Sequence, residues 1–140
     1  MKNQIIRLKD YRPVSFEIKD VYLTFKLDPK RTIVSSKMNI VPTGNSDLFL
    51  DGSQLKLKSA KINGKDATSI VSQNDKGIKF FKKNLPKKRF ILEIINEINP
   101  KANTALEGLY ISNGIYCTQC EAEGFRKITY FLDRPDVLTK

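Results

Sequence analysis

Residues 114–137, GIYCTQCEAEGFRKITYFLDRPDV, hold the side chains of this sequence that are best suited to chemistry. Cys117 and Cys120 are the two cysteines of the chain and have the spacing C-x-x-C. Gln119 lies between them, and Glu121 follows directly. Three kinds of chemistry could use this stretch: a redox dithiol, part of a zinc site, or a polar strand that binds a ligand.

A zinc site cannot be completed within this chain. Structural zinc sites take four Cys or His ligands, and catalytic sites usually take three protein ligands. The sequence has two cysteines and no histidine. The missing histidine also removes the most common general base and every Ser-His or Cys-His nucleophilic pair. We therefore expect that this chain alone binds no zinc.

A redox role for the cysteines conflicts with the sequence around them. Redox C-x-x-C pairs lie at helix N-termini in a βαβ context, whereas residues 109–116, LYISNGIY, are strand-like. Residues three apart in a strand lie about 10 Å apart and point to opposite faces, while a disulfide needs Cα atoms within about 7 Å. We therefore predict that Cys117 and Cys120 are unpaired structural thiols.

The third possibility follows from the two-residue period of a strand. If the chain stays extended, Cys117, Gln119, Glu121 and Glu123 share one face. A carboxamide beside a carboxylate can accept hydrogen bonds from an ammonium, which has three donors and no acceptor. The alternative is a surface strand with solvated polar residues, and the residues alone favour it because exposed Gln and Glu are the commonest case.

The composition is that of one globular domain, spanning residues 1–140. Of the 140 residues, 40% are hydrophobic and 29% are charged, which is ordinary for a soluble domain of this size. The first residues lack the apolar region of a secretory signal, and no window approaches the run of about 20 apolar residues that spans a bilayer. These features lead us to expect a cytoplasmic protein with reduced cysteines.

A net charge of +10 raises the question of nucleic-acid binding. Residues 79–90, KFFKKNLPKKRF, place basic side chains between aromatic ones, which can hold phosphates and stack bases. The competing interpretation is a solvated loop between two strands whose Phe side chains face the core. We favour the loop, and expect no specific nucleic-acid binding, because net charge governs solubility rather than fold or site. A free-standing basic β-sandwich that binds nucleic acid or another acidic partner remains the alternative function.

The hydrophobic pattern predicts an all-β fold. Short segments alternate apolar and polar residues at a spacing of about 8 to 12 residues, with turn signals such as NGK at 63–65 between them. No helical pattern intervenes, so an antiparallel β-sandwich is expected. A short C-terminal helix is also predicted, because Ile128, Phe131 and Leu132 have helical spacing before Pro135.

Residues 98–140 resemble the last part of the N-terminal domain of the bacterial aminopeptidase N family. The members of this family are zinc metallopeptidases. The runs NTALEGLY, CTQCEAEGFR and ITYFLDRPDV carry this resemblance. It extends more weakly upstream through YRPVSFEIKDVYLTFKLDP and RFILEIINEINP, and so covers essentially the whole chain.

The resemblance implies a saddle-shaped N-terminal β-domain of a larger cytosolic hydrolase that releases N-terminal amino acids from peptides. The Zn²⁺ of such a protein is held by an H-E-x-x-H helix in a catalytic domain, and this motif is absent from the present sequence. The chain would therefore contain no catalytic residue and no metal ligand, and would be inactive alone. Its implied partners are the catalytic domain of the same polypeptide and peptides with a free N-terminus, with no membrane among them.

The resemblance also assigns substrate binding to Gln119 and Glu121. Glu121 would bind the free α-ammonium of the substrate, and Gln119 would line the same pocket, so that the domain caps the active site. Arg126 and Asp133 are expected to pair with each other or with the next domain. The resemblance gives no mechanistic role to the other charged residues of the segment, Glu107, Glu123 and Arg134.

Overall fold

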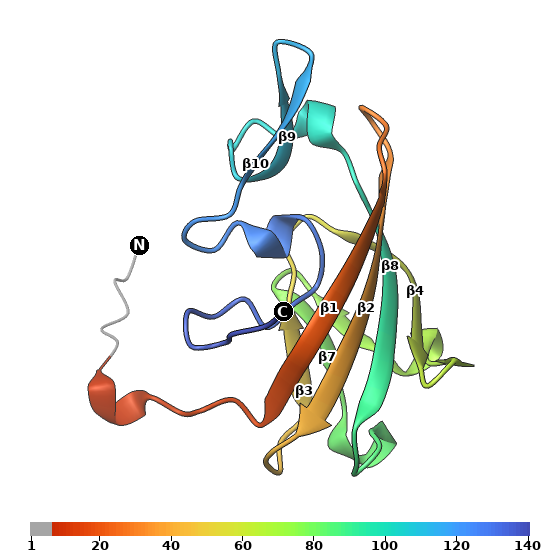
Figure 1. Ribbon diagram of the computed structural model, residues 1–140, viewed down its shortest axis with the longest axis vertical. Coiled ribbons are helices and arrows are strands. Elements are labelled where there is room, and N and C mark those ends of the chain that lie inside the picture. Colours follow the sequence, from red (N-terminus) through yellow and green to blue (C-terminus); the bar gives the residue numbers. More distant parts are fainter. Residues whose placement is uncertain (1–6) are drawn as a thin grey trace.

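The computed structural model describes residues 7–140, which form ten β-strands and five short 3-10 turns (Figure 1). The strands are β1 (Phe16–Lys26), β2 (Thr32–Pro42), β3 (Leu48–Asp51), β4 (Lys56–Ile62), β5 (Lys65–Asp66), β6 (Ser72–Asn74), β7 (Gly77–Phe80), β8 (Phe90–Ile98), β9 (Gly108–Ser112) and β10 (Ile115–Gln119). The 3-10 turns are η1 (Leu8–Asp10), η2 (Thr68–Ile70), η3 (Lys82–Asn84), η4 (Pro100–Ala102) and η5 (Phe125–Lys127).

The strands form three antiparallel sheets. The largest has the order β1-β2-β8-β4-β5, the second has the order β3-β7-β6, and β9 and β10 form a separate hairpin. The two larger sheets bury their side chains in one shared hydrophobic core. The hairpin projects from one end of the molecule (Figure 1). This arrangement confirms the predicted all-β fold and its antiparallel sheets.

The strands form where the sequence alternates, because one face of each sheet meets the core. In β8, Phe90, Leu92 and Ile94 are buried, while the residues between them are half-buried. Full burial of such a side chain stabilises the fold by about 1.5–3 kcal/mol. The predicted hairpin at 63–65 is confirmed, since Asn63 and Gly64 turn the chain between β4 and β5 with positive φ angles of 49° and 79°.

A second, smaller core lies under the projecting hairpin. It consists of Val34, Ile98, Leu109 and Ile128, which come from β2, β8, β9 and the C-terminal segment. The fully buried Asn96 of β8 lies beside it. Its side-chain amide donates to the Ile128 carbonyl at 3.0 Å, and its Oδ1 accepts from the Thr129 hydroxyl at 2.8 Å. Asn96 therefore fastens the C-terminal segment to the large sheet.

The C-terminal segment is not the helix expected from Ile128, Phe131 and Leu132. Helical structure is limited to η5, one 3-10 turn that ends at Lys127. Phe131 instead forms an isolated antiparallel bridge with Asp51 of β3, with N–H···O distances of 2.8 and 3.1 Å. All five residues from 128 to 132 are buried. A surface helix buries only one stripe of residues, so a surface helix does not fit a segment in which every residue from 128 to 132 is buried.

From the hydrogen bonds of Asn96 we predict that its replacement by alanine destabilises the fold. Asn96→Ala leaves the Ile128 carbonyl and the Thr129 hydroxyl without their partner and opens a small cavity. We expect a loss of about 2–4 kcal/mol in the free energy of unfolding, measured by urea denaturation. Asn45→Ala, in an exposed loop, is the control and should change stability by less than about 0.5 kcal/mol. Equal stability of the two variants would contradict the role of Asn96.

Candidate functional site

The residues around the two cysteines form a hairpin rather than one strand. Asn113 and Gly114 have φ angles of 51° and 77° and turn the chain between β9 and β10. Two positive φ angles in a two-residue connection are typical of a type I′ turn, which favours Asn-Gly. Residues 109–116, LYISNGIY, were expected to be strand-like throughout, but the Asn-Gly pair within them forms this turn. In the hairpin, Gln119 lies opposite Gly108.

The chain leaves the extended conformation directly after Gln119. A turn follows over residues 121–124, closed by a 2.9 Å hydrogen bond from the Gly124 N–H to the Cys120 carbonyl. The Glu121–Ala122 peptide bond in this turn is cis. A Cβ atom on Gly124 would collide with the carbonyl oxygen of Gln119, so only glycine fits this close approach. The predicted common face of Cys117, Gln119, Glu121 and Glu123 is therefore wrong beyond Gln119.

Gln119 and Glu121 are both exposed at this end of the hairpin. Within residues 7–140, neither side chain makes a hydrogen bond or an ion pair. By contrast, Glu123 turns back towards Arg126, and Glu107 pairs with Lys127 at 3.1 Å. The hairpin thus leaves one carboxamide and one carboxylate available to a group outside the described residues.

Both cysteines are free, half-buried thiols. Cys120 packs against the smaller core, and burial raises the pKa of its thiol, with the nearby Asp133 carboxylate acting in the same direction. A redox-active thiol needs a lowered pKa. The environment of Cys120 therefore supports the structural interpretation of the C-x-x-C pair.

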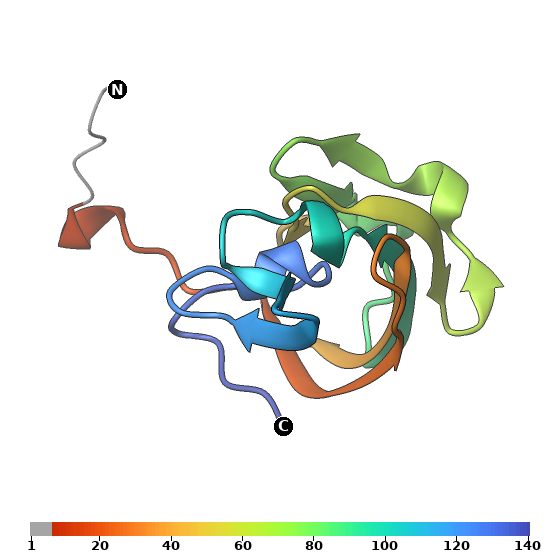
Figure 2. The same ribbon diagram turned by 90° about the horizontal axis from the view of Figure 1, so that it is seen from above.

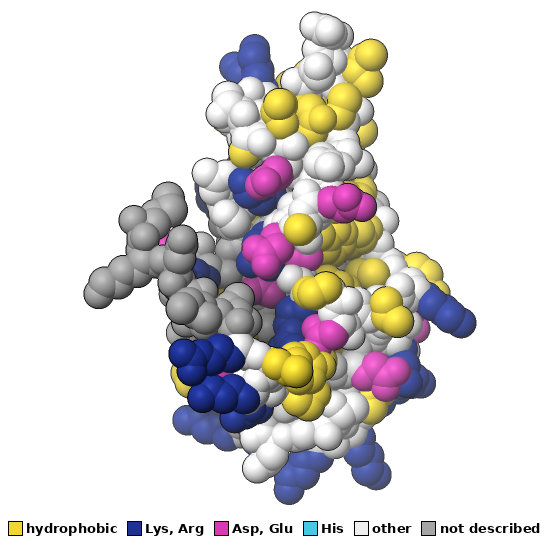
Figure 3. All heavy atoms as spheres, turned by 90° about the vertical axis from the view of Figure 1, so that its left-hand side faces the viewer, with side chains coloured by type: hydrophobic (Ala, Val, Ile, Leu, Met, Phe, Trp, Pro, Cys, Tyr) yellow, Lys and Arg dark blue, Asp and Glu magenta, His cyan; other side chains and the backbone are white. Residues whose placement is uncertain are grey.

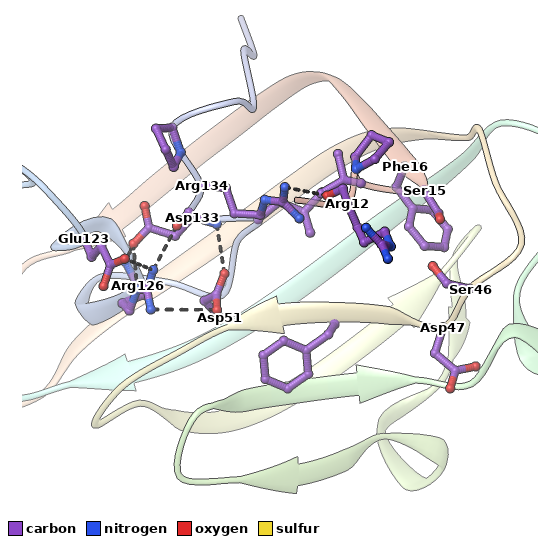
Figure 4. Close-up of a pocket in the computed structure, with 15 residues that line it drawn as sticks. Arg12, Ser15, Phe16, Ser46, Asp47, Asp51, Glu123, Arg126, Asp133 and Arg134 are labelled. Carbon is purple, nitrogen blue, oxygen red and sulfur yellow. Dashed lines mark hydrogen bonds and ion pairs between the residues drawn. The ribbon is translucent and has the colours of Figure 1, made fainter. Parts of the chain in front are cut away.

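Arg126 is the centre of an ion-pair cluster next to this turn (Figure 4). Its Nε atom lies 2.9 Å from Oδ2 of Asp133, and its Nη2 atom donates to the Asp133 carbonyl at 2.8 Å. Two further carboxylates are more distant, Glu123 at 3.6 Å and Asp51 at 3.8 Å. The expected pairing of Arg126 with Asp133 is thus present within this domain.

The cluster joins the end of β3 to two neighbouring parts of the C-terminal third of the chain, which lies far from β3 in the sequence. Asp51 ends β3, Arg126 lies in η5, and Asp133 belongs to the C-terminal segment. The Asp51 carboxylate also accepts the Asp133 N–H at 3.1 Å. Burial raises the pKa of Asp51, while Arg126 opposes this shift. Asp51 could not be predicted as a partner of Arg126 from the sequence, because no local pattern connects positions 51 and 126.

An open pocket lies beside this cluster, between β3, the C-terminal segment and residues 12–16 (Figure 4). Figure 3 shows acidic side chains gathered around the middle of this face. Gln119 and Glu121 do not line the pocket. The ion-pair cluster is therefore close to the predicted site residues along the chain, but the pocket itself is a different feature.

Two further observations concern metals and membranes. No group of three or more acidic or cysteine side chains in residues 7–140 is arranged to hold a metal ion. In the same residues, no helix has the length and apolar character needed to cross a bilayer.

The basic stretch at 79–90 is a loop between two core strands. Phe80 and Phe90 are fully buried, so neither is available to stack on a base. Phe81 is partly exposed, with the Lys79 ammonium 5.8 Å from its ring centre. This arrangement agrees with a solvated loop whose flanking Phe side chains face the core.

The fold and the exposed hairpin define an all-β domain that offers hydrogen-bond acceptors at its surface. The chain belongs to the family of peptidase M1 N-terminal domains, whose family model matches residues 12–140. The family expected from the sequence is therefore confirmed.

Its relatives are much longer proteins. The chain is 52% identical to aminopeptidase N of Escherichia coli (strain K12) over 133 residues, which are 94% of this chain and 15% of that protein. It is 44% identical to aminopeptidase N of Caulobacter vibrioides over 141 residues, covering 98% of this chain and 16% of that protein. The chain thus spans about one sixth of the length of these curated relatives.

Solved structures share the fold. The crystal structure of Legionella pneumophila aminopeptidase A in complex with aspartic acid superposes with a TM-score of 0.85 at 26% identity, covering 96% of this chain and 16% of that one. An M1 zinc metallopeptidase of Deinococcus radiodurans gives a TM-score of 0.74 at 15% identity, covering 89% of this chain and 31% of that one. At 15% identity, the similarity to the Deinococcus radiodurans protein shows only a shared fold.

From the contacts of Arg126 we predict that its replacement strongly destabilises the fold. Arg126→Ala leaves the carboxylate of Asp133, which is only 12% exposed, without its cation. We expect a loss of about 2–3 kcal/mol in the free energy of unfolding, measured by urea denaturation. Arg126→Lys should lose less, because it keeps the charge but not the planar fork.

Arg31→Ala is the matched control for this experiment. Arg31 is 72% exposed and lies 3.6 Å from Glu97, and pairs of this kind contribute at most about 1 kcal/mol. If Arg126→Ala were no more destabilising than Arg31→Ala, the cluster would not hold the three segments together.

Proposed function

We propose that this chain is the N-terminal domain of a zinc aminopeptidase, a hydrolase that releases N-terminal amino acids from peptides. We further propose that Gln119 and Glu121 bind the free α-ammonium group of the substrate. Family membership supports the first statement, together with relatives named aminopeptidase N at 52% and 44% identity. The observation that carries the second is that both side chains are exposed and unpartnered within residues 7–140.

The chemistry of an ammonium explains why these residues would suit it. An ammonium has three donors and no acceptor, and moving it out of water is unfavourable unless it is paired and hydrogen-bonded. Glu121 supplies a negative charge, and Gln119 supplies a neutral acceptor two residues away. Because a peptide has its only α-ammonium at the N-terminus, such acceptors would select substrates by their free amino group.

The hydrolytic step would take place outside this domain. Zn²⁺ activates water and polarises carbonyl groups in metallohydrolases. The residues present here do not fit a zinc site, since the chain has no histidine and its described part contains no metal-binding group. The catalytic domain of the same polypeptide would hold the metal.

The domain would also cap the active site. An exposed hairpin that meets the catalytic domain would exclude water from the cleft between them. Exclusion of water strengthens the attraction between a carboxylate and an ammonium, because the effective dielectric constant falls. Clefts at domain interfaces are common substrate sites. A cytoplasmic location remains an expectation from the sequence.

The first test concerns the isolated chain. The 140-residue protein should contain no stoichiometric zinc and should not hydrolyse a chromogenic alanyl substrate, since it lacks the ligands. Elemental analysis after purification without chelator and a standard amidase assay measure both quantities. One tightly bound zinc ion per chain would contradict the proposal that the zinc ligands all belong to the catalytic domain.

The second test concerns Glu121 in the full-length parent protein. Truncating one partner of a buried charge pair typically costs about 2–5 kcal/mol. We expect Glu121→Ala to lower kcat/KM by about 30- to 400-fold, in the lower half of that range, because other acceptors share the ammonium. Glu121→Gln should have a smaller effect, since its amide oxygen still accepts a hydrogen bond, and Gln119→Ala a smaller one again.

Two controls accompany these variants. Bound zinc should be unchanged in all three, because none of the replaced side chains is a ligand. Glu17→Ala removes an exposed carboxylate from β1 and should leave kcat/KM unchanged. Wild-type kcat/KM in Glu121→Ala would mean that this carboxylate does not bind the amino terminus, and that the solvated polar surface was the correct interpretation.

A further inference from the structure

The dipeptide Asn-Gly occurs twice in the sequence, at 63–64 and at 113–114. Each pair forms the two-residue turn of a hairpin. The φ angles are nearly the same, 49° and 79° in the first turn and 51° and 77° in the second. All four residues are exposed. The two turns therefore have the same residues, backbone and exposure, and a difference in their chemistry must come from their contacts.

An Asn-Gly pair can react within itself. The Gly peptide nitrogen loses its proton to solvent base and attacks the Asn side-chain carbonyl carbon, Cγ, which gives a cyclic imide. The Cγ–Nδ2 bond breaks, and the amide takes up a proton from water and leaves as ammonia. Water then opens the ring. Cleavage at Cγ gives Asp, whereas cleavage at the main-chain carbonyl gives isoaspartate, in which the backbone passes through the side chain. Glycine favours this reaction because it has no side chain to shield its nitrogen.

The carboxamide of Asn63 is held by the neighbouring strand. Its Oδ1 atom accepts the Ile91 N–H of β8 at 2.9 Å, and the Asn63 N–H donates to the Ile91 carbonyl at 2.8 Å. These two bonds continue the pairing of β4 with β8 beyond Ile62 and Leu92. Ring closure requires the side chain and the peptide nitrogen to rotate out of their positions in the turn, so both hydrogen bonds oppose the reaction.

No contact of this kind holds Asn113. Within residues 7–140, neither its side chain nor its N–H makes a hydrogen bond. The hairpin projects from one end of the molecule (Figure 1) and consists of two strands only, and a two-stranded hairpin is marginally stable by itself. Leu109 anchors its base in the smaller core, whereas residues 112–115 are all exposed. The turn at 113–114 therefore opens more easily than the turn at 63–64.

We propose that Asn113 is a site of spontaneous deamidation and isomerisation, whereas Asn63, in the same dipeptide and the same kind of turn, is protected by Ile91. The reaction needs no reactant other than solvent water. Its products carry a new carboxylate at the end of the hairpin, and isoaspartate also adds a carbon atom to the backbone of the turn. The longer backbone no longer matches a two-residue connection between Ser112 and Ile115.

Isoaspartate at position 113 would disturb the pairing of the whole hairpin. β9 and β10 are in register from Ser112 and Ile115 at the turn to Gly108 and Gln119 at the base, and the turn of a hairpin fixes its register. A longer turn would therefore loosen the strand that ends at Gln119. The effect on catalysis in the parent protein rests on the function proposed above, whereas the modification itself does not.

Peptide mapping of the aged chain measures both sites in one experiment. The folded 140-residue protein is incubated in mildly alkaline buffer and digested, and the Asn, Asp and isoaspartyl peptides are separated by chromatography and identified by mass spectrometry. Asn113 should be modified at least about 10-fold faster than Asn63, because two hydrogen bonds oppose opening at Asn63. Equal rates at the two sites, or faster modification of Asn63, would overturn the proposal.

The same incubation in concentrated urea is the control for sequence context. Unfolding removes the bonds to Ile91, so Asn63 and Asn113 should then react at similar rates. A difference that persisted unchanged in urea would assign the contrast to the flanking residues and would also overturn the proposal.

Gly114→Asn and Gly64→Asn are the matched variants. Asn adopts positive φ angles more readily than most residues, and its side chain shields the nitrogen that attacks. Gly114→Asn should suppress the modification of Asn113, while Gly64→Asn should leave its rate unchanged. Undiminished modification of Asn113 in Gly114→Asn would contradict the assigned reaction.

Ageing of the full-length parent protein tests the effect on catalysis. Its kcat/KM should fall as isoaspartate accumulates at position 113, and Gly114→Asn aged in the same way should retain activity. Unchanged kcat/KM in fully modified protein would overturn this consequence. The Glu121→Ala measurement tests the proposed function separately, so failure of the one can be told from failure of the other.

Discussion

The ion pairs of Arg126 are the constraint that holds the C-terminal third of this domain against β3. The guanidinium group contacts the end of β3, the turn after the second cysteine, and the C-terminal segment, through Asp51, Glu123 and Asp133. Its planar fork can bond to several oxygens at once, which a lysine ammonium cannot do in the same geometry. Without this cation, the three carboxylates would lie close together without the partner that they share. The fold of the C-terminal third is therefore controlled by electrostatics as well as by burial.

The C-terminal segment is also held in place by burial and by hydrogen bonds to Asn96. Asn96 of β8 bonds to the backbone and side chain of residues 128 and 129, and the five residues from 128 to 132 are buried. The C-terminal segment is thus held by a polar contact at one end and by Arg126 and the Asp51–Phe131 bridge at the other. Because this segment follows the turn at 121–124 directly, both contacts limit where Glu121 can lie.

This framework is suited to presenting polar groups to a second domain. The β9–β10 hairpin projects from the sheets (Figure 1), and in the view from above it lies nearest to the reader (Figure 2). Its last strand ends at Gln119, and Glu121 lies in the exposed turn that follows. An exposed carboxylate is fully hydrated and costs little in the isolated domain. The same group would gain strength as a partner of an ammonium once another domain removed the surrounding water. The proposed substrate contact therefore needs the domain interface, while its geometry is set by contacts within this domain.

The sequence by itself determined the strands, the family and the absence of a zinc site. Alternation of apolar and polar residues is a local signal that a sheet with one buried face must satisfy, and it predicted the all-β fold. The Asn-Gly pairs at 63–64 and 113–114 encode their hairpin turns through positive φ angles, although only the first was recognised. The lack of histidine is a matter of composition and does not depend on the fold.

Tertiary structure alone decided the path of the chain after Gln119. The helical spacing of Ile128, Phe131 and Leu132 was overridden, because this segment is covered on both sides and pairs with Asp51. The predicted common face of Gln119 and Glu121 ended at the turn that Gly124 closes. Asp51 and Arg126 are 75 positions apart, and no local pattern can report a contact across that separation. Local sequence fixes the period of a strand, whereas packing against distant residues fixes where the strand ends.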